Sequence, residues 1–270
     1  MAADGIFSVL AAVIPALLLV AGVYIYVALV RQISARIEEP SVTPVRQFAW
    51  PEATLATFIA LVFLSGLAAS ASHEVRAIET RDLWANALFS IGLLLFIAAF
   101  LRLRRFDLNS LGGFSKIGFG RAATTGGILL LAAYPLILLA EVVTQKLARG
   151  NLEKQAIVEL FTASSTLEQR VLIILLAVVV APLAEEFFFR FFLYGVVRRY
   201  LGRAVGIIVS ALLFAAVHAH LPSFAPLFVL GVCFAIAYEW SGSLLVSMTM
   251  HALFNALALT ALAFPEVIPQ

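Results

Sequence analysis

Residues 171–197 read VLIILLAVVVAPLAEEFFFRFFLYGVV, an apolar stretch whose only charged side chains are those of Glu185, Glu186 and Arg190. A helix needs about 20 mostly apolar residues to cross the hydrocarbon core of a bilayer, and this stretch is longer than that. The nearest charged ends of the stretch lie ~20 Å of helix away from Glu185. We therefore expect a transmembrane helix that carries charges near the middle of the membrane, where charge is costly.

The rest of the chain has the composition of a membrane protein. Of its 270 residues, 63% are hydrophobic and 13% are charged, which is about half the charged share of soluble proteins. Such a chain has too little polar surface to cover a soluble core. The composition therefore predicts an all-α polytopic membrane protein with about eight transmembrane helices, near residues 6–30, 52–72, 83–101, 122–140, 170–197, 204–220, 223–240 and 242–263.

Lys and Arg residues predict how these helices are oriented. Eleven of them lie in the connections that follow the first, third and fifth apolar runs, and six lie in the other connections. Because basic residues accumulate in cytoplasmic loops, both termini are expected outside. Basic residues at the ends of apolar runs indicate contact with membrane lipids and no nucleic-acid partner.

We expect two regions along the chain. Residues 1–165 contain about four helices and an amphipathic interfacial segment near residues 141–169. Residues 166–265 contain about four helices and the intramembrane charges. We expect the functional site inside this C-terminal four-helix portion.

Spacing separates the two glutamates of the central stretch. Glu186 and Arg190 are four residues apart, so that they lie on one helical face and can form an ion pair. Glu185 is rotated by about 100° from Glu186 and has no partner within its own helix. Pro182 lies one turn earlier, where it can kink the helix and release backbone groups.

Three further polar residues on later spans are candidate partners for Glu185, namely His218, His251 and Asn255. A single His or Asn on a transmembrane helix is often only an interhelical hydrogen-bond donor. Two carboxylates, two histidines and an Asn on three spans, with almost no other buried polarity expected, are difficult to explain by packing alone. They favour a functional site.

Hydrolysis is the chemistry that this set suits. A desolvated carboxylate can take a proton from water, and His and Asn can donate hydrogen bonds to an oxyanion. Two His and one Glu also form a ligand set of catalytic zinc. The sequence contains no His-Glu-x-x-His and no Gly-x-Ser-x-Gly motif.

Three motifs together resemble those of one family of intramembrane proteases. They are Glu185-Glu186-x-x-x-Arg190, Phe214-x-x-x-His218 and His251-x-x-x-Asn255, joined by a turn at 238–245. In this order they resemble the CAAX-protease and bacteriocin-processing (CPBP, Abi or Rce1-like) family over roughly residues 168–262. The resemblance implies an intramembrane (metallo)endopeptidase of the CAAX prenyl protease type, in the cell membrane of a prokaryote.

The resemblance also implies a role for each residue of the set. Glu185 activates the water, and His218 positions it or binds metal. His251 and Asn255 bind metal or stabilise the oxyanion, whereas Glu186 and Arg190 support the geometry. If zinc is used, the expected ligands are Glu185, His218 and His251; a metal-independent mechanism remains the alternative. The implied substrate is a membrane-associated peptide or protein, possibly lipid-modified.

Two other functions remain compatible with the sequence. The first is a non-catalytic membrane scaffold or immunity protein that uses the same fold. The second is a proton-coupled transporter, because a mid-membrane Glu with His also suits proton relay. The absence of a second polar segment that mirrors the first makes the transporter the weaker of the two.

Overall fold

The computed structural model describes residues 2–36, 47–70, 80–147, 161–162, 164 and 166–264, and within these ranges it is helical with no strand. This confirms the predicted all-α class. The helices are α1 (Ala2–Ala35), α2 (Trp50–Ser70), α3 (Thr80–Leu103), α4 (Leu108–Gly112), α5 (Phe119–Leu147), α7 (Leu167–Leu175), α8 (Ala181–Glu186), α9 (Tyr194–Val217), α10 (Leu221–Ser241) and α11 (Leu244–Ala263), with π-helical stretches η1 (Leu176–Val180) and η2 (Phe187–Leu193) on either side of α8.

Seven continuous helices in the described part of the chain are long and apolar enough to cross a membrane. One of them, Leu167–Val217, has 51 residues and would be about 75 Å long if it were straight. Gly202 interrupts it with φ +85° and ψ 172°, a backbone conformation outside the helical region. The helix therefore consists of two arms, which correspond to two of the eight apolar runs.

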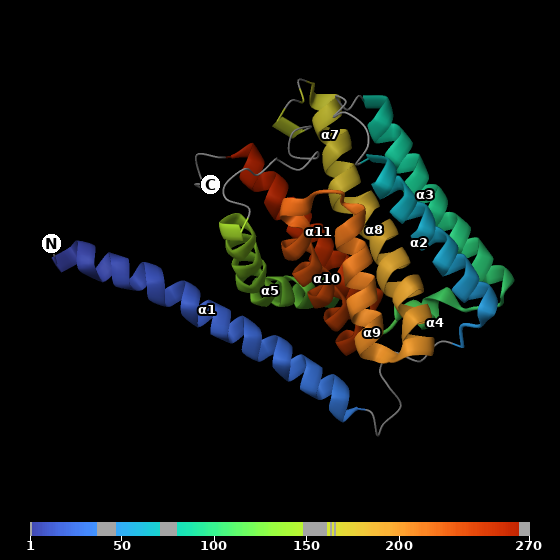
Figure 1. Cartoon of the computed structure of the whole chain (residues 1–270), viewed down its shortest axis with the longest axis horizontal. Helices are drawn as coiled ribbons and strands as arrows, with labels where there is room; N and C mark the ends of the chain where they lie inside the picture. Colours follow the sequence, from blue (N-terminus) through green and yellow to red (C-terminus); the bar gives the residue numbers. More distant parts are fainter. Residues whose placement is uncertain are drawn as a thin grey trace.

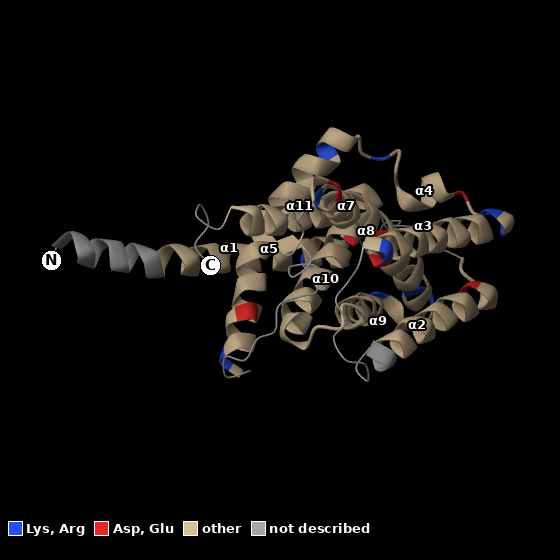
Figure 2. Cartoon of the chain, turned by 90° about the horizontal axis from the view of Figure 1, so that it is seen from above, with Lys and Arg blue, Asp and Glu red and all other residues tan. Residues whose placement is uncertain are grey.

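The connections on one side of the predicted topology lie together at one end of the bundle (Figure 1). The Arg36 side chain, just after α1, donates a hydrogen bond to the carbonyl of Trp240 at 2.9 Å. Gly113, after α4, packs against the carbonyl of Gly242. Figure 2 shows many Lys and Arg residues at helix ends and in connections. Which end faces the cytoplasm stays a prediction.

A fully buried helical turn lies at the centre of the bundle. The segment 187–192 reads FFFRFF, and each of its residues is at most 5% exposed. A helix that is apolar around its whole circumference must be covered on every side. Here α3, α9, α10 and α11 contact η2, so residues 187–192 lie in the core of the molecule.

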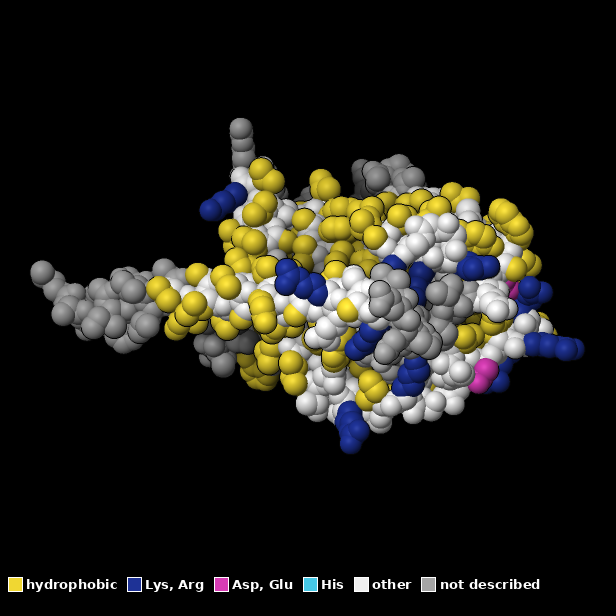
Figure 3. Space-filling model, turned by 90° about the horizontal axis from the view of Figure 1, so that it is seen from below, with side chains coloured by type: hydrophobic (Ala, Val, Ile, Leu, Met, Phe, Trp, Pro, Cys, Tyr) yellow, Lys and Arg dark blue, Asp and Glu magenta, His cyan; other side chains and the backbone are white. Residues whose placement is uncertain are grey.

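The outer surface is apolar, as a bilayer requires. Val20, Leu88 and Leu131 are 66%, 69% and 73% exposed, on three different helices. Figure 3 shows apolar side chains along the flanks and basic side chains on the end viewed from below. With seven apolar helices, the chain is an integral membrane protein.

Residues of both predicted regions share one buried cluster, which includes Tyr26 and Leu129 from the first and Phe188 and Met250 from the second. The division near residue 165 stays a prediction. Much of the expected amphipathic segment 141–169 lies outside the described residues, and its first part continues α5 to Leu147.

Candidate active site

The helix that carries the two glutamates is irregular on both sides. The six-residue α8 lies between η1 and η2, where the helix has the wider π turn. Such stretches occur frequently at functional sites. Pro182 contributes to η1, because it has no N–H to donate to an earlier carbonyl. The N–H of Ala181 donates to the carbonyl of Leu176, five residues earlier, as in a π turn. Near Pro182, where a kink was expected, the backbone hydrogen bond of Ala181 reaches the residue five positions earlier in place of four.

Glu186 contacts two basic side chains, those of Arg190 and His251. Its Oε1 lies 2.9 Å from Nη1 of Arg190 and 3.1 Å from Nδ1 of His251. Glu186 and Arg190 are fully buried, and His251 is 3% exposed. The predicted i, i+4 pair is therefore present, and it extends to α11 through His251. Because removing Glu186 or Arg190 would take away the strongest partner of the buried charge that remains, the ion pair is expected to stabilise the cluster.

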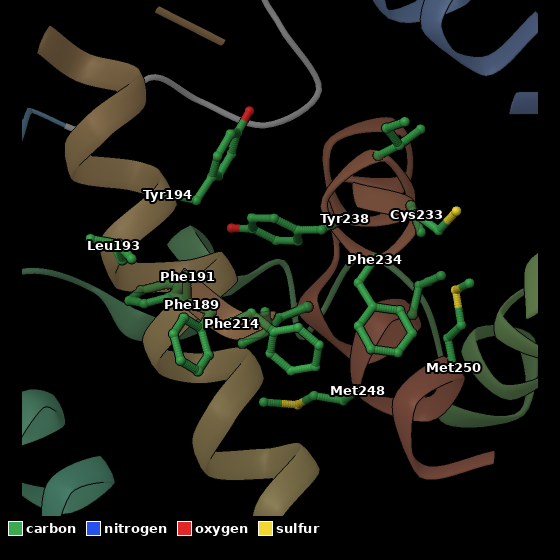
Figure 4. Packing of buried hydrophobic residues seen from close by; sticks show 14 of the residues in the cluster. Phe189, Phe191, Leu193, Tyr194, Phe214, Cys233, Phe234, Tyr238, Met248 and Met250 are labelled. Atoms are coloured by element: carbon green, nitrogen blue, oxygen red, sulfur yellow. The ribbon is translucent and has the colours of Figure 1, made fainter. Parts of the chain in front are cut away.

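Arg190 is enclosed by aromatic rings and a backbone carbonyl. Its guanidinium lies 4.2 Å from the ring centroid of Phe214 and 5.1 Å from that of Phe234. Nη2 donates to the carbonyl of Gly231 at 3.5 Å. Figure 4 shows the rings of Phe189, Phe214 and Phe234 next to one another. These rings hold the cation by cation–π attraction in a site without bulk water.

Phe214 connects His218 to this cluster. His218 follows the end of α9, and its Nδ1 lies 2.7 Å from the carbonyl of Phe214. A carbonyl only accepts hydrogen bonds, so Nδ1 carries a proton and the Nε2 of a neutral ring is an acceptor. The Phe214 ring also lies 4.9 Å from the His218 ring and 5.7 Å from the His251 ring.

The short second arm of α9 accounts for the depth of His218. From Arg203 to Val217 it has about 15 residues, or ~22 Å, which is less than the ~30 Å hydrocarbon core. The helix ends where Ala219 takes a positive φ of +52°. His218 can therefore lie below the membrane surface although it is at a helix end.

Glu185 lies beside the ion pair and makes no hydrogen bond through Oε2 to any described residue, although this atom is buried. Its charge is within electrostatic range of Arg190. Since Arg190 is engaged by Glu186, Glu185 retains lone pairs that can accept a proton. Glu185 was expected to have no partner within its own helix, but Arg190, five residues later in the same helix, is within electrostatic range of it.

Asn255 lies apart from the charged cluster. Its Nδ2 donates a 2.7 Å hydrogen bond to the carbonyl of Ala177 in η1. Nδ1 of His220 is hydrogen-bonded to Oγ of Ser223 at 2.7 Å, away from the charged cluster. The structure thus joins Glu186, Arg190 and His251 directly and adds His218 through Phe214. Asn255, on α11, is hydrogen-bonded to the helix that leads to Glu185.

The expected zinc ligands Glu185, His218 and His251 do not form a metal site in this arrangement. The described residues contain no group of three or more His, Cys, Asp or Glu side chains placed to hold a metal ion. Both histidine rings are oriented by other partners, namely the Phe214 carbonyl and Glu186. Metal use therefore stays a prediction.

A second buried charge cluster has no counterpart in the sequence analysis. Glu239, at 3% exposure, accepts from the hydroxyl of Tyr194 at 2.6 Å, from Arg198 at 2.8 Å and from Arg203 at 2.9 Å. Glu52 is also fully buried and pairs with Arg104 at 2.8 Å. The expectation of almost no other buried polarity is therefore wrong. Arg198 and Arg203 lie on either side of Gly202, and both reach Glu239 on α10.

Comparison with known proteins identifies the C-terminal part of the chain. Residues 167–257, about a third of the chain, match the family described as "Type II CAAX prenyl endopeptidase Rce1-like". Searches of curated proteins and of solved structures returned no match. The matched segment contains every residue of the three motifs and the cluster around Glu186. Over residues 167–257 the chain is therefore similar to the Rce1-like domain, which supports its relation to the CAAX-protease and bacteriocin-processing family.

Proposed function

We propose that the protein is an intramembrane endopeptidase that hydrolyses a peptide bond in a membrane-associated peptide or protein. The observation that carries the proposal is Glu185, whose buried Oε2 has no hydrogen bond to any described residue. Oε2 of Glu186 also has none, but Glu186 is held through Oε1 by Arg190 and His251. A carboxylate in this position has the chemistry of a general base. The match to Rce1-like endopeptidases supports the same assignment.

In the proposed reaction Glu185 takes a proton from a water molecule while the water oxygen bonds to the scissile carbonyl carbon. The carbonyl oxygen becomes an oxyanion. Glu185 then returns the proton to the leaving nitrogen as the C–N bond breaks, which gives a carboxyl group and an amine. One carboxylate thus acts first as base and then as acid.

The two histidines have different tasks in this proposal. His218 has its Nδ1 proton directed to the Phe214 carbonyl, so that Nε2 accepts a hydrogen bond from the water and holds it near Glu185. His251 has Nδ1 against Glu186 and Nε2 on the other side of the ring. When doubly protonated beside the Glu186 carboxylate, it donates through Nε2 to the oxyanion.

The proposed substrate class follows from the name of the matched family and from the apolar exterior. A CAAX-type peptide, with or without a prenyl group, is the first substrate to test. Zinc assistance is a separate proposal. Metal analysis of purified protein, combined with a cleavage assay before and after chelation, tests it: joint loss of zinc and activity supports it, and full activity of metal-free protein excludes it.

Glu185→Gln tests the proposed function. It keeps the size of the side chain and removes the base, so that cleavage of a prenylated CAAX-type peptide should fall by about 10²–10⁴-fold. Glu141→Gln, at an exposed site on α5, is the matched control and should leave cleavage unchanged. Full activity of Glu185→Gln would contradict the proposal.

The same variants separate the other functions. A biological effect that survives in both Glu185→Ala and His218→Ala would favour a scaffold. Proton-coupled uptake by reconstituted vesicles, without peptidase activity, would favour a transporter.

A further inference from the structure

The carbonyl of Ala177 has lost its regular partners within the helix. In an α-helix it would accept from Ala181, but the N–H of Ala181 donates to Leu176. In a π turn it would accept from residue 182, which is a proline and has no N–H. A carbonyl left without a donor inside a membrane is costly, so a donor from another helix is needed.

Asn255 supplies that donor from α11. Its side chain lies 2.7 Å from the Ala177 oxygen, and since a carbonyl only accepts, the amide nitrogen is the atom that faces it. His251 lies one turn earlier on the same face of α11 and bonds Glu186. Two side chains of α11 thus hold residues 177 and 186, on either side of Glu185 in the chain.

We propose that Asn255 is a positioning residue that acts through the Ala177 carbonyl and fixes the helix segment carrying Glu185. The inference rests on the proposed role of Glu185 as the base. One of the two amide protons of Asn255 is used in this bond, and its effect on catalysis is transmitted by the position of α8. This assignment differs from the oxyanion contact expected from the sequence, in which Asn255 would touch the substrate.

A double-mutant cycle with Pro182 distinguishes positioning from direct contact. Pro182→Ala returns an N–H that can donate to the Ala177 carbonyl within the helix. Asn255→Ala should lower kcat by about 10- to 100-fold in the native background, with KM little changed. In the Pro182→Ala background the same substitution should cost at least about fivefold less. An oxyanion donor would cost the same factor in both backgrounds.

Carbonyl NMR provides a readout that does not depend on proteolysis. Labelling Ala with ¹³C at the carbonyl and Val with ¹⁵N selects the Ala–Val peptide bonds, and Ala177–Val178 is one of only four in the chain. In detergent micelles Asn255→Ala should shift the Ala177 carbonyl signal upfield, and adding Pro182→Ala should reverse most of the shift. Asn86→Ala, on exposed α3 surface, is the control and should leave the signal in place.

The outcomes separate this inference from the proposed function. An Ala177 signal that does not respond to Asn255→Ala overturns the positioning role, whatever the activity. Equal kcat losses in both Pro182 backgrounds also overturn it. If the Ala177 carbonyl signal shifts in Asn255→Ala but the protein cleaves no peptide, the contact between Asn255 and Ala177 is supported and only the protease assignment is refuted. A responsive signal together with a reduced cost in the Pro182→Ala background supports both.

Discussion

Nδ1 of His251 lies 3.1 Å from Oε1 of Glu186, the same oxygen that Arg190 approaches to 2.9 Å. The two residues are 65 positions apart in the chain, and their contact joins two different helices. It fixes the orientation of the imidazole and leaves Nε2 as the ring nitrogen available for chemistry. Glu186 therefore orients a histidine in addition to balancing an arginine.

Replacing Glu186 with Gln should destabilise the protein strongly. The substitution keeps the side-chain volume but removes the carboxylate that interacts most strongly with the buried Arg190 and leaves only the weaker interaction with Glu185. The unfolding free energy should fall by about 3–5 kcal/mol, measured by denaturant unfolding in detergent micelles. Asp82→Asn, in an exposed pair with Arg81 at 3.8 Å, is the control and should change it by less than about 0.5 kcal/mol. Equal effects of the two variants would refute the importance of the buried cluster.

Arg190→Lys should not be a neutral exchange. Lysine keeps the charge near Glu186, but it lacks the planar group that lies over Phe214 and the second nitrogen that reaches the Gly231 carbonyl. We expect a loss of about 1–2 kcal/mol in unfolding free energy. The same exchange at the exposed Arg199 should have no measurable effect, and a similar loss there would point to a general effect of lysine.

Phe214→Leu tests whether this ring connects the site. The ring contacts Arg190, His218 and His251, and leucine cannot reach all three. Stability should fall by about 1–2 kcal/mol, and kcat should fall by about 10- to 100-fold because both histidines lose a support. Phe96→Leu, at a position 56% exposed, should leave both quantities unchanged. A kcat loss no larger than that of Phe96→Leu would contradict the role of Phe214.

Gly113 should be intolerant of any side chain. Its φ is +66°, and an added Cβ would clash with the carbonyl oxygen of Gly242. Alanine therefore adds backbone strain of about 1–2 kcal/mol to a steric clash at the end of the bundle. Gly92→Ala, in α3 with open space around it, should instead raise the midpoint of thermal unfolding. Stabilisation by both substitutions would show that the contact between Gly113 and Gly242 is unimportant.

Local patterns in the sequence predicted the features that depend on neighbouring residues. The apolar runs gave the helices, and the spacing of Glu186 and Arg190 gave their ion pair. The contact from Asn255 to Ala177 could not be found in this way, because it depends on a π turn that shifts the hydrogen bonds by one residue. A four-residue motif shows which side chains share a face, but it does not show what that face touches.

The buried Glu239 was missed for a related reason. Arg198 and Arg203 sit at the ends of apolar runs, where basic residues commonly set topology, and their shared partner is 41 and 36 residues away. Nothing in the local sequence distinguishes an arginine in a loop from one that reaches back to the next helix. Only the three-dimensional arrangement brings them to one carboxylate.

The cluster at Glu239 has a consequence for the order of events during biosynthesis. The ribosome makes Arg198 and Arg203 before it makes Glu239, and α10 must enter the membrane before the carboxylate can reach them. Basic residues commonly retain a connection on one side of the membrane during insertion, and we expect Arg198 and Arg203 to do so before α10 is inserted. Once α10 is in place, the same two side chains pair with Glu239. Residues that are expected to guide insertion thus also stabilise the packing of α9 against α10 in the folded protein.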